Sequence, residues 1–461
     1  MSGKERRLAQ RRILAEDPEW NLSPVPKLSD LCIKAIVTNF EKRPIINGIP
    51  SKHRERVLSS ISTELPLTIV TPLIPEQLYW KRRAVANFKN CDPKQHGGSW
   101  KQLFCELHLQ TIIESYSPKK GRGSDEWDVF LATVRLLSPC INKLVIKQLR
   151  PTEPAEGTVV KATDPPPDHL DLQTMVSSLP QLRDLSIYYG IRDCNIDFNW
   201  SFFGMTLNDC VLLTNVLKAN NTLTSLRIQS SSVDDDRCRL ISNALLTNKA
   251  LKTLDLSHNK IGDSGARALA KVLSVQTTVL ADLNLSNNKV GRQGAYCLGK
   301  ALATNKTLQH LRLRMNYIGD TGGAQLCGEL RKNDTLVSVD LCGNNLGAET
   351  VRALCALLEK NGRQLASLDL SCNKLGLFPS ATTIFAASAA PAVASAAAAG
   401  TSAPGNFGDD AKKEVDTAGK ALFEAISQNK YVTFFDIRVT DLSQEYSVAI
   451  QGIIAENMQA L

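Results

Sequence analysis

One segment of the chain has the spacing of a phosphate-binding loop. Gly294, Gly299 and Lys300 follow the GxxxxGK pattern, in which backbone amides and a lysine hold phosphate groups. The next residue is Ala301, where such loops carry the serine or threonine that binds magnesium. The segment also falls in a predicted helix, whose amide groups are already hydrogen-bonded. We therefore expect no nucleotide to bind here.

The histidines and other catalytic residue types show no productive spacing. No histidine has a second histidine four residues away, and no GxSxG, HExxH or paired-carboxylate pattern occurs. The sequence predicts that this chain is not an enzyme and that it needs no cofactor, no metal and no small-molecule substrate. The six histidines are His53, His96, His108, His169, His258 and His310.

The cysteines give no sign of a metal site or a disulfide framework. The twelve run from Cys32 to Cys372 without a CxxC pair. Charged residues rather than an apolar leader follow Met1, and no run of about 18 apolar residues occurs. We expect reduced thiols with structural roles in the cytoplasm, and no membrane-spanning helix.

Four Asn-x-Ser/Thr sequons begin at Asn21, Asn220, Asn305 and Asn333. The last three share one register, after a predicted helix and before the first leucine of the next strand. This regularity indicates a role in the fold rather than glycosylation.

A repeat of 28 or 29 residues organises most of the chain. Each copy follows the pattern LxxLxLxxNxL and continues with apolar residues at helical spacing. Alternate side chains of a strand share one side, so the leucines would be buried and the parallel strands would line a concave face, with helices on the convex side. The sequence predicts an α/β leucine-rich-repeat solenoid. Six consecutive copies begin at Leu223, Leu251, Leu280, Leu308, Leu336 and Leu365.

Two recurring residue types have a predicted structural role. An asparagine ends each strand, where a buried bend needs both a donor and an acceptor, and stacked amides can form a ladder. A glycine lets each helix approach the turn closely. The asparagines are Asn259, Asn288, Asn316, Asn344 and Asn373, with Thr440 at this position in the last copy, and the glycines are Gly265, Gly294 and Gly322.

The chain divides into five parts by pattern. Residues 1–125 have helical spacing and would form a basic, all-helical N-terminal cap over the first strand, as an open array requires. Residues 126–222 hold irregular first repeats with insertions, and residues 223–375 hold the regular repeats. Residues 376–417 are rich in Ala, Ser and Pro and are predicted to be a disordered insertion within one repeat. Residues 418–461 supply the last helix, the last strand and a C-terminal cap.

The net charge of +8 is unevenly distributed. The first 125 residues hold 21 Lys and Arg against 13 Asp and Glu, and the remainder holds 33 of each. This excludes a uniformly basic nucleic-acid coat. The basic N-terminus suits nucleic acid, acidic lipid or an acidic polymer such as tubulin, and a solvated tail without a partner is the alternative. It lacks the interleaved aromatics typical of single-strand binding. The candidate basic patch is Lys4, Arg6, Arg7, Arg11 and Arg12.

The residues between the strand leucines would form the concave face. Neighbouring parallel strands lie about 4.8 Å apart, so Asp340 and Asp369 become close like charges, partly offset by Arg312. A carboxylate-rich strip suits a basic partner segment, although aspartate is also a common solvated residue at this position. The candidate protein-binding residues are Arg227, Asp255, Asn284, Arg312, Arg314, Asp340 and Asp369.

The N-terminal region carries a family resemblance. Residues 28–40 (LSDLCIKAIVTNF), followed by Leu65-Pro66-Leu67 and Tyr79-Trp80, are similar to the T-complex-associated testis-expressed family, which supplies dynein regulatory complex subunit 5. The repeats resemble the ribonuclease-inhibitor type, and the resemblance covers most of the chain except the Ala-rich insertion.

This resemblance implies a non-enzymatic scaffold in the cytoskeleton, at the axoneme of motile cilia or flagella. There the nexin–dynein regulatory complex links doublet microtubules and regulates dynein-driven motility. The implied partners are other subunits of that complex, with tubulin, the doublet microtubule or dynein as further partners. Neither nucleic acid nor a membrane is expected as a partner.

A second hypothesis places the chain among Ran-type small-GTPase activators or other leucine-rich-repeat regulatory proteins. Those activators usually carry a strongly acidic C-terminal tail, whereas residues 456–461 read ENMQAL. An innate-immune receptor is disfavoured, since we find no nucleotide-binding domain before the repeats.

Overall fold

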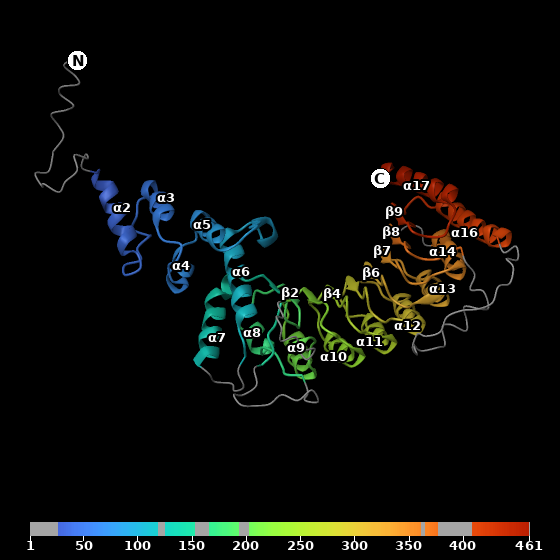
Figure 1. Ribbon diagram of the computed structural model, residues 1–461, viewed down its shortest axis with the longest axis horizontal. Helices are drawn as coiled ribbons and strands as arrows, with labels where there is room; N and C mark the ends of the chain where they lie inside the picture. Colours follow the sequence, from blue (N-terminus) through green and yellow to red (C-terminus); the bar gives the residue numbers. More distant parts are fainter. Residues whose placement is uncertain are drawn as a thin grey trace, which may run out of the picture. The chain divides into compact units, whose positions relative to one another are not determined.

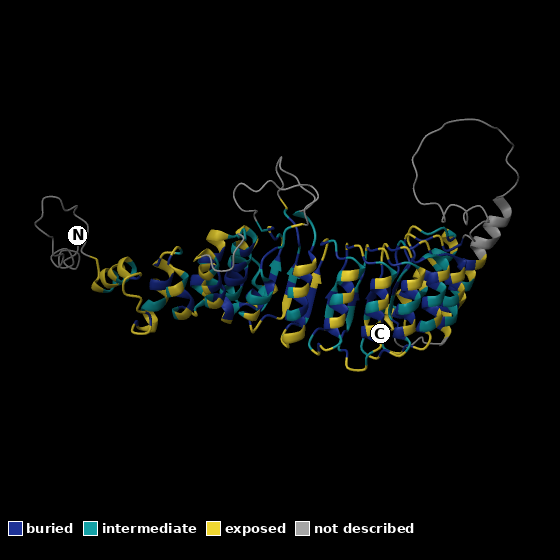
Figure 2. Ribbon diagram, turned by 90° about the horizontal axis from the view of Figure 1, so that it is seen from below, coloured by how far each residue is buried: buried dark blue, intermediate teal, exposed yellow. Residues whose placement is uncertain are grey.

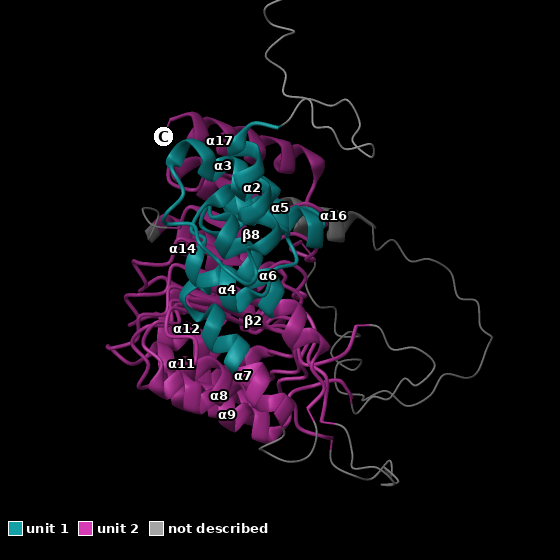
Figure 3. Ribbon diagram, turned by 90° about the vertical axis from the view of Figure 1, so that its left-hand side faces the viewer, with its two compact units in different colours: residues 1–109, 132–142 teal, residues 110–131, 143–461 magenta. Residues whose placement is uncertain are grey.

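The protein is seen here as a computed structural model, which describes residues 26–118, 125–152, 166–192, 202–360, 365–376 and 408–460. The chain divides into two compact units, shown in different colours in Figure 3. Unit 1 takes residues 1–109 and 132–142, and unit 2 takes residues 110–131 and 143–461. The five-part division proposed from pattern uses different criteria and stays a prediction.

All the regular elements in the described part of unit 1 are helices, as the apolar spacing predicts. Its core contains an aromatic cluster in which the Trp80 ring lies 5.5 Å from the rings of both Tyr79 and Phe104. The Trp80 indole N–H donates to the Ile74 carbonyl at 2.7 Å, so its polar atom is satisfied although the side chain is fully buried. The helices are α2 (Leu28–Asn39), α3 (Ser51–Ser60), α4 (Leu67–Leu73), α5 (Gln77–Asn87), α6 (Trp100–Ser115) and α7 (Asp125–Leu137), the last two being shared with unit 2.

Unit 2 contains one parallel sheet of nine strands in sequence order. The strands are β1 (Lys143–Ile146), β2 (Asp184–Ile187), β3 (Ser225–Ile228), β4 (Thr253–Asp255), β5 (Asp282–Asn284), β6 (His310–Arg312), β7 (Ser338–Asp340), β8 (Ser367–Asp369) and β9 (Phe434–Asp436). The helices are α8 (Leu172–Ser177), α9 (Leu207–Ala219), α10 (Asp235–Leu245), α11 (Asp263–Leu273), α12 (Arg292–Leu302), α13 (Gly319–Leu330), α14 (Ala348–Lys360), α16 (Gly408–Gln428) and α17 (Gln444–Gln459). Figure 1 shows the strands of unit 2 along the inner side of a curved array and helices α8 to α16 along its outer side, with α17 next to β9 at the C-terminal end. The predicted leucine-rich-repeat solenoid is therefore confirmed.

The repeat leucines form the core of unit 2. Leu254, Leu283 and Leu311 are aligned on neighbouring strands and are fully buried. Each helix has buried and exposed residues on different sides, visible as alternating colours in Figure 2. Truncating one such leucine to alanine typically costs about 2–5 kcal/mol, because the cavity cannot fully collapse.

The strand-end asparagines form the predicted ladder. The Asn316 amide donates to the carbonyls of Leu313, in its own repeat, and Leu285, in the preceding repeat, both at 2.9 Å. Its Oδ1 accepts the N–H of Val290 from the preceding repeat at 3.0 Å. A single amide thus satisfies buried backbone groups of two repeats. Asn259, Asn288, Asn344 and Asn373 bond in the same way.

Asparagines of the sequons occupy a second set of structural positions, buried at Asn305 and Asn333 and half-buried at Asn220. The Asn333 amide donates to the Leu302 carbonyl at 2.7 Å, and its Oδ1 accepts the N–H of Leu336 at 2.8 Å. Asn305 makes the same pair of bonds one repeat earlier. Oδ1 of Asn220 accepts the N–H of Leu223. The predicted structural role is confirmed for these three sequons, and Asn21 lies outside the described residues.

Glycine at the start of a helix is required by close approach, as Gly294 shows. Its N–H donates to Oδ1 of Asp263 at 2.8 Å, and an added Cβ would lie 2.7 Å from the same oxygen. The segment 294–301, which has the spacing of a phosphate-binding loop, lies wholly within α12. Its amides are used by the helix and by Asp263, which removes the groups that would bind phosphate.

The C-terminal part differs from its predicted limits in one respect. Helix α16 begins at Gly408, inside the segment 376–417 that was predicted to be disordered. Most of that segment, residues 377–407, lies outside the described residues. Strand β9 nevertheless pairs in register with β8, so the insertion leaves the stacking of strands intact. Among the described helices, none is both long and apolar enough to span a membrane.

Candidate protein-binding surface

The concave face of unit 2 is an array of side chains in register. The last residue of each three-residue strand from β4 to β9 aligns with its counterpart on the next strand, and Arg227 of β3 aligns with Asp255 of β4, since the sheet is parallel and unshifted. From β3 to β9 this row is Arg227, Asp255, Asn284, Arg312, Asp340, Asp369 and Asp436. The structure therefore brings together six of the seven predicted face residues in one line, and Arg314 follows two residues after Arg312.

A local bond explains why aspartate and asparagine recur in this row. Oδ1 of Asp255 accepts the N–H of Ser257 at 2.9 Å, and Oδ1 of Asn284 accepts the N–H of Ser286 at 3.0 Å. The carboxylates of the later strands bond the residue two positions on in the same way. Short side chains with an acceptor oxygen suit this bend. One oxygen of each aspartate thus has a structural role in the bend after its strand.

Charges in the middle of the row are compensated. The Arg312 guanidinium forms two hydrogen bonds to Asp282, at 2.8 and 3.2 Å. Asp255 accepts a bond from the Gln229 amide at 2.8 Å and faces Arg227 across the register. Arg312 was expected to offset the charges of Asp340 and Asp369 in part. Its hydrogen bonds go to Asp282 on the other neighbouring strand, but its positive charge, like that of Arg314, still opposes the rise in the pKa of Asp340 that burial causes.

Charges at the C-terminal end are not balanced in this way. Asp340, Asp369 and Asp436 lie on three successive strands, directly opposite one another. Asp436 is held by Arg438, whose Nε donates to its carboxylate at 3.0 Å. Asp340 and Asp369 form no ion pair with any described residue. Asp436 was missed by sequence analysis, although its place after Phe435 in the last strand pattern could have revealed it.

The two ends of this acidic row differ in proton affinity. Burial, and then the nearby Asp369 carboxylate, raise the pKa of Asp340 above its usual value. The hydrogen bond from the Arg438 guanidinium lowers the pKa of Asp436. The structure therefore holds Asp340 in an environment unfavourable to its own charge, while Asp436 is neutralised internally.

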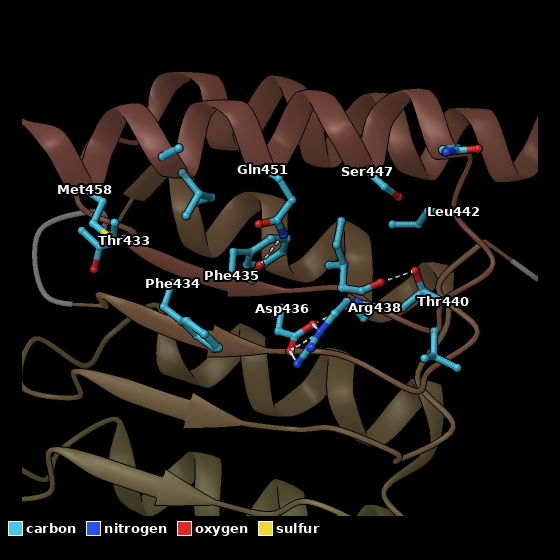
Figure 4. A pocket seen from close by; sticks show the side chains of 15 residues that line it. Thr433, Phe434, Phe435, Asp436, Arg438, Thr440, Leu442, Ser447, Gln451 and Met458 are labelled. Atoms are coloured by element: carbon cyan, nitrogen blue, oxygen red, sulfur yellow. Dashed lines mark hydrogen bonds and ion pairs between the residues drawn. The ribbon is translucent and has the colours of Figure 1, made fainter.

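A groove adjoins the acidic row at the C-terminal end of the array (Figure 4). It has a volume of about 820 Å³ and lies between β9 and α17. Phe434 and Met458 line it and remain 50% and 66% exposed, so the groove offers two large apolar side chains to solvent. Asp436 and Arg438 lie at its floor in the close-up view. This groove has no counterpart in the sequence analysis, because it depends on how the last helix crosses the last strand.

A buried His–Asp pair resembles part of a catalytic triad. His169 Nδ1 lies 2.8 Å from Oδ2 of Asp209, and both side chains are fully enclosed. Burial alone would raise the pKa of Asp209, but hydrogen bonds from His169 and from backbone N–H groups lower it. The Asp209 carboxylate also caps α9 through the backbone of Thr206. These bonds and the lack of solvent access indicate that the His169–Asp209 pair has a structural role.

The described cysteines are free thiols. Burial raises the pKa of Cys238 and of Cys327 to about 12, which keeps both protonated. A hydrogen bond from Cys105 lowers the pKa of Cys140 to about 7. Within the described part of the chain, no group of three or more His, Cys, Asp or Glu side chains is placed to hold a metal ion.

The predicted basic patch cannot be located. Lys4, Arg6, Arg7, Arg11 and Arg12 all lie outside the described residues.

The fold and the surface define a leucine-rich-repeat protein with a side-chain-rich concave face. A family model described as "Leucine Rich repeat" matches residues 247–270, which hold β4 and most of α11, and residues 304–327, which hold β6 and most of α13.

Curated relatives carry one name. The chain is 36% identical over 238 residues to "Dynein regulatory complex subunit 5" of Mus musculus, and 35% identical to the Homo sapiens protein of that name. The Chlamydomonas reinhardtii protein of the same name is 32% identical over 214 residues. These matches cover 49, 49 and 46% of this chain and 47, 47 and 50% of the relatives, so the chain spans about half the length of the curated relatives it matches. Their names confirm the family resemblance that the N-terminal residues indicated.

Proposed function

We propose that this chain is a non-enzymatic scaffold subunit of the axonemal nexin–dynein regulatory complex. In this role it holds other subunits through its concave face, in a complex that links doublet microtubules and regulates dynein in motile cilia. The observation that carries the proposal is its 36% identity to dynein regulatory complex subunit 5. The regular array supports it, since a rigid row of solvent-facing side chains suits protein recognition.

The charge distribution suggests that the basic N-terminal region and the concave face contact different partners. The basic first 125 residues are our candidate contact for an acidic neighbour, either tubulin or another subunit. The candidate basic patch, Lys4, Arg6, Arg7, Arg11 and Arg12, belongs to this segment. The concave residues Arg227, Asp255, Asn284, Arg312, Arg314, Asp340 and Asp369 are the candidate contacts for other subunits.

The test is retention in axonemes. Tagged full-length chain is expressed in ciliated cells that lack their own counterpart, and axonemes are extracted with detergent and washed with salt. We expect the chain to stay in the axonemal fraction together with other subunits of the complex. Absence of the chain from washed axonemes would overturn the proposal.

A kinetic assay separates this function from GTPase activation. Purified chain is added to a Ran-type GTPase loaded with GTP, and phosphate release is followed. We expect the basal rate to be unchanged. An acceleration that depends on chain concentration would favour the activator hypothesis instead.

A further inference from the structure

The groove between β9 and α17 lies where the sheet would otherwise expose an open edge. Backbone groups of β9 that face away from β8 need partners, and an unpaired edge is a template for another strand. The Gln451 side chain from α17 donates to the Phe435 carbonyl at 2.8 Å. The Thr440 hydroxyl donates to the Ile437 carbonyl at 2.7 Å. Two edge acceptors are therefore already satisfied from within the chain.

This capping decides what kind of occupant the groove suits. Addition of a strand from another protein, or from a second copy of this chain, would need the carbonyls that Gln451 and Thr440 already occupy. Recognition in the groove must therefore use side chains. The side chains on offer are apolar at Phe434 and Met458, which are half or more exposed.

Charge next to the groove specifies the occupant further. Asp436 lines the groove, and Asp369 and Asp340 follow it on the two neighbouring strands. Arg438 is paired with Asp436, whereas neither Asp340 nor Asp369 forms an ion pair with another described residue. A cation placed over these two strands would relieve the repulsion between their carboxylates.

We propose that this groove and the adjoining carboxylates bind a basic amphipathic segment of a partner protein. Apolar side chains of the segment contact Phe434 and Met458, and a lysine or arginine beside them pairs with Asp369 and Asp340. The inference rests on the proposed function as an interaction subunit and names the chemistry of one partner site.

Binding is tested with full-length chain and synthetic peptides of about 18 residues. The probes are an amphipathic helix of leucine and lysine, the same helix with glutamate in place of lysine, and a scrambled leucine–lysine peptide. Fluorescence anisotropy gives each Kd. We expect the basic amphipathic peptide to bind about tenfold or more tightly than the other two. Equal binding of the glutamate peptide would overturn the proposal.

Two variants and two matched controls locate the site. F434S/M458S removes the apolar contacts, and D340K/D369K reverses the charge; each should weaken binding of the basic peptide about tenfold or more. V448S changes a residue of α17 that is 64% exposed but does not line the groove, and E349K/E359K makes the same charge change on α14. Both controls should bind like wild type. Equal loss in variants and controls would contradict the proposed site, and thermal unfolding verifies that all four proteins are folded.

The same variants in the axoneme assay distinguish the two proposals. Loss of wild-type chain from washed axonemes would overturn the proposed function. Retention of wild type together with unchanged retention of F434S/M458S and D340K/D369K would overturn the groove alone. We expect wild type and both controls to be retained and both site variants to be depleted.

Discussion

The middle and the C-terminal end of the concave face are built from copies of the same repeat pattern, but their charged side chains are paired differently. In the middle, Arg312 binds Asp282 and the Gln229 amide binds Asp255. At the end, Asp340 and Asp369 lie in register without an ion pair to any described residue. Since the backbone is the same in both places, the difference must arise from the side chains alone.

This contrast separates residues that serve the fold from residues available for recognition. A compensated charge gains little from a partner, because an existing pair must first be broken. A carboxylate without an ion pair has no such bond to break, and burial disfavours the charge of Asp340 in the free protein, so a cation from a partner can relieve it. The same end of the array also has the exposed apolar groove and a non-standard ladder residue, Thr440.

The largest expected effect is on stability and comes from removing an amide of the asparagine ladder. Asn344→Ala should lower stability by about 3 kcal/mol or more, because it leaves several buried carbonyls and N–H groups of two repeats without partners. Thr440→Ala removes one bond, to the Ile437 carbonyl, and should cost only about 1 kcal/mol. Urea unfolding of both variants gives the comparison. Equal costs would show that the last repeat is as tightly coupled as the middle ones.

The second effect is a gain of stability. Val439 has φ of 57°, a conformation unfavourable for a β-branched residue, and its side chain is 80% exposed. His258 and Asn287 occupy this position in the middle of the array and bond to each other at 2.7 Å. Val439→Asn should therefore stabilise the chain by about 1 kcal/mol, measured as a higher unfolding midpoint. A lower midpoint would mean that the valine packs more than its exposure indicates.

Two charge-removing variants should have opposite signs. Because the folded state raises the pKa of Asp340, its ionised form opposes folding at neutral pH and the penalty disappears as the pH falls. Asp340→Asn should raise the melting temperature slightly at pH 7 and have no effect in acid. The lowered pKa of Asp436 means that its carboxylate stabilises the fold above its unfolded pKa, and that this contribution is lost as the pH falls through the folded pKa. Asp436→Asn should lower the melting temperature at pH 7. Shifts of the same sign at pH 7 would contradict the contrast.

The smallest expected effect concerns the ion pair in the middle of the concave face. Arg312→Ala breaks an ion pair whose side chains are 44% and 21% exposed, so it should cost no more than about 1 kcal/mol and less in high salt. Thermal unfolding at two salt concentrations measures this. Arg312→Ala should also leave binding of the basic peptide unchanged or slightly stronger, since it frees Asp282. Weaker binding would place the binding site in the middle of the face instead.

Periodicity was sufficient to predict the regular repeats. Leucine spacing and a recurring asparagine determine strand register, because each buried side chain has only one place in a stacked array. The bonds of Asn316 follow directly from that register. The sequon asparagines were assigned to the fold for the same reason.

Features that depend on side-chain choice or on a single copy could not be predicted in this way. Arg312 lies between Asp282 and Asp340, and its long side chain can reach either strand, so its partner is a matter of packing. The insertion separates Asp436 from the regular copies in the sequence, so its alignment with Asp369 was not predicted. The shape of the groove depends on how α17 crosses β9, and the repeat pattern does not determine that orientation.

The array of neighbouring ladder bonds also has a mechanical consequence. A pulling force along the array passes in series through one repeat interface after another, since each repeat contacts only its neighbours. Interfaces fastened by an asparagine share bonds between both repeats, whereas the Thr440 hydroxyl bonds only within its own. Under a pulling force, the interface between the repeats of β8 and β9 should therefore separate first, while the other repeat interfaces stay intact.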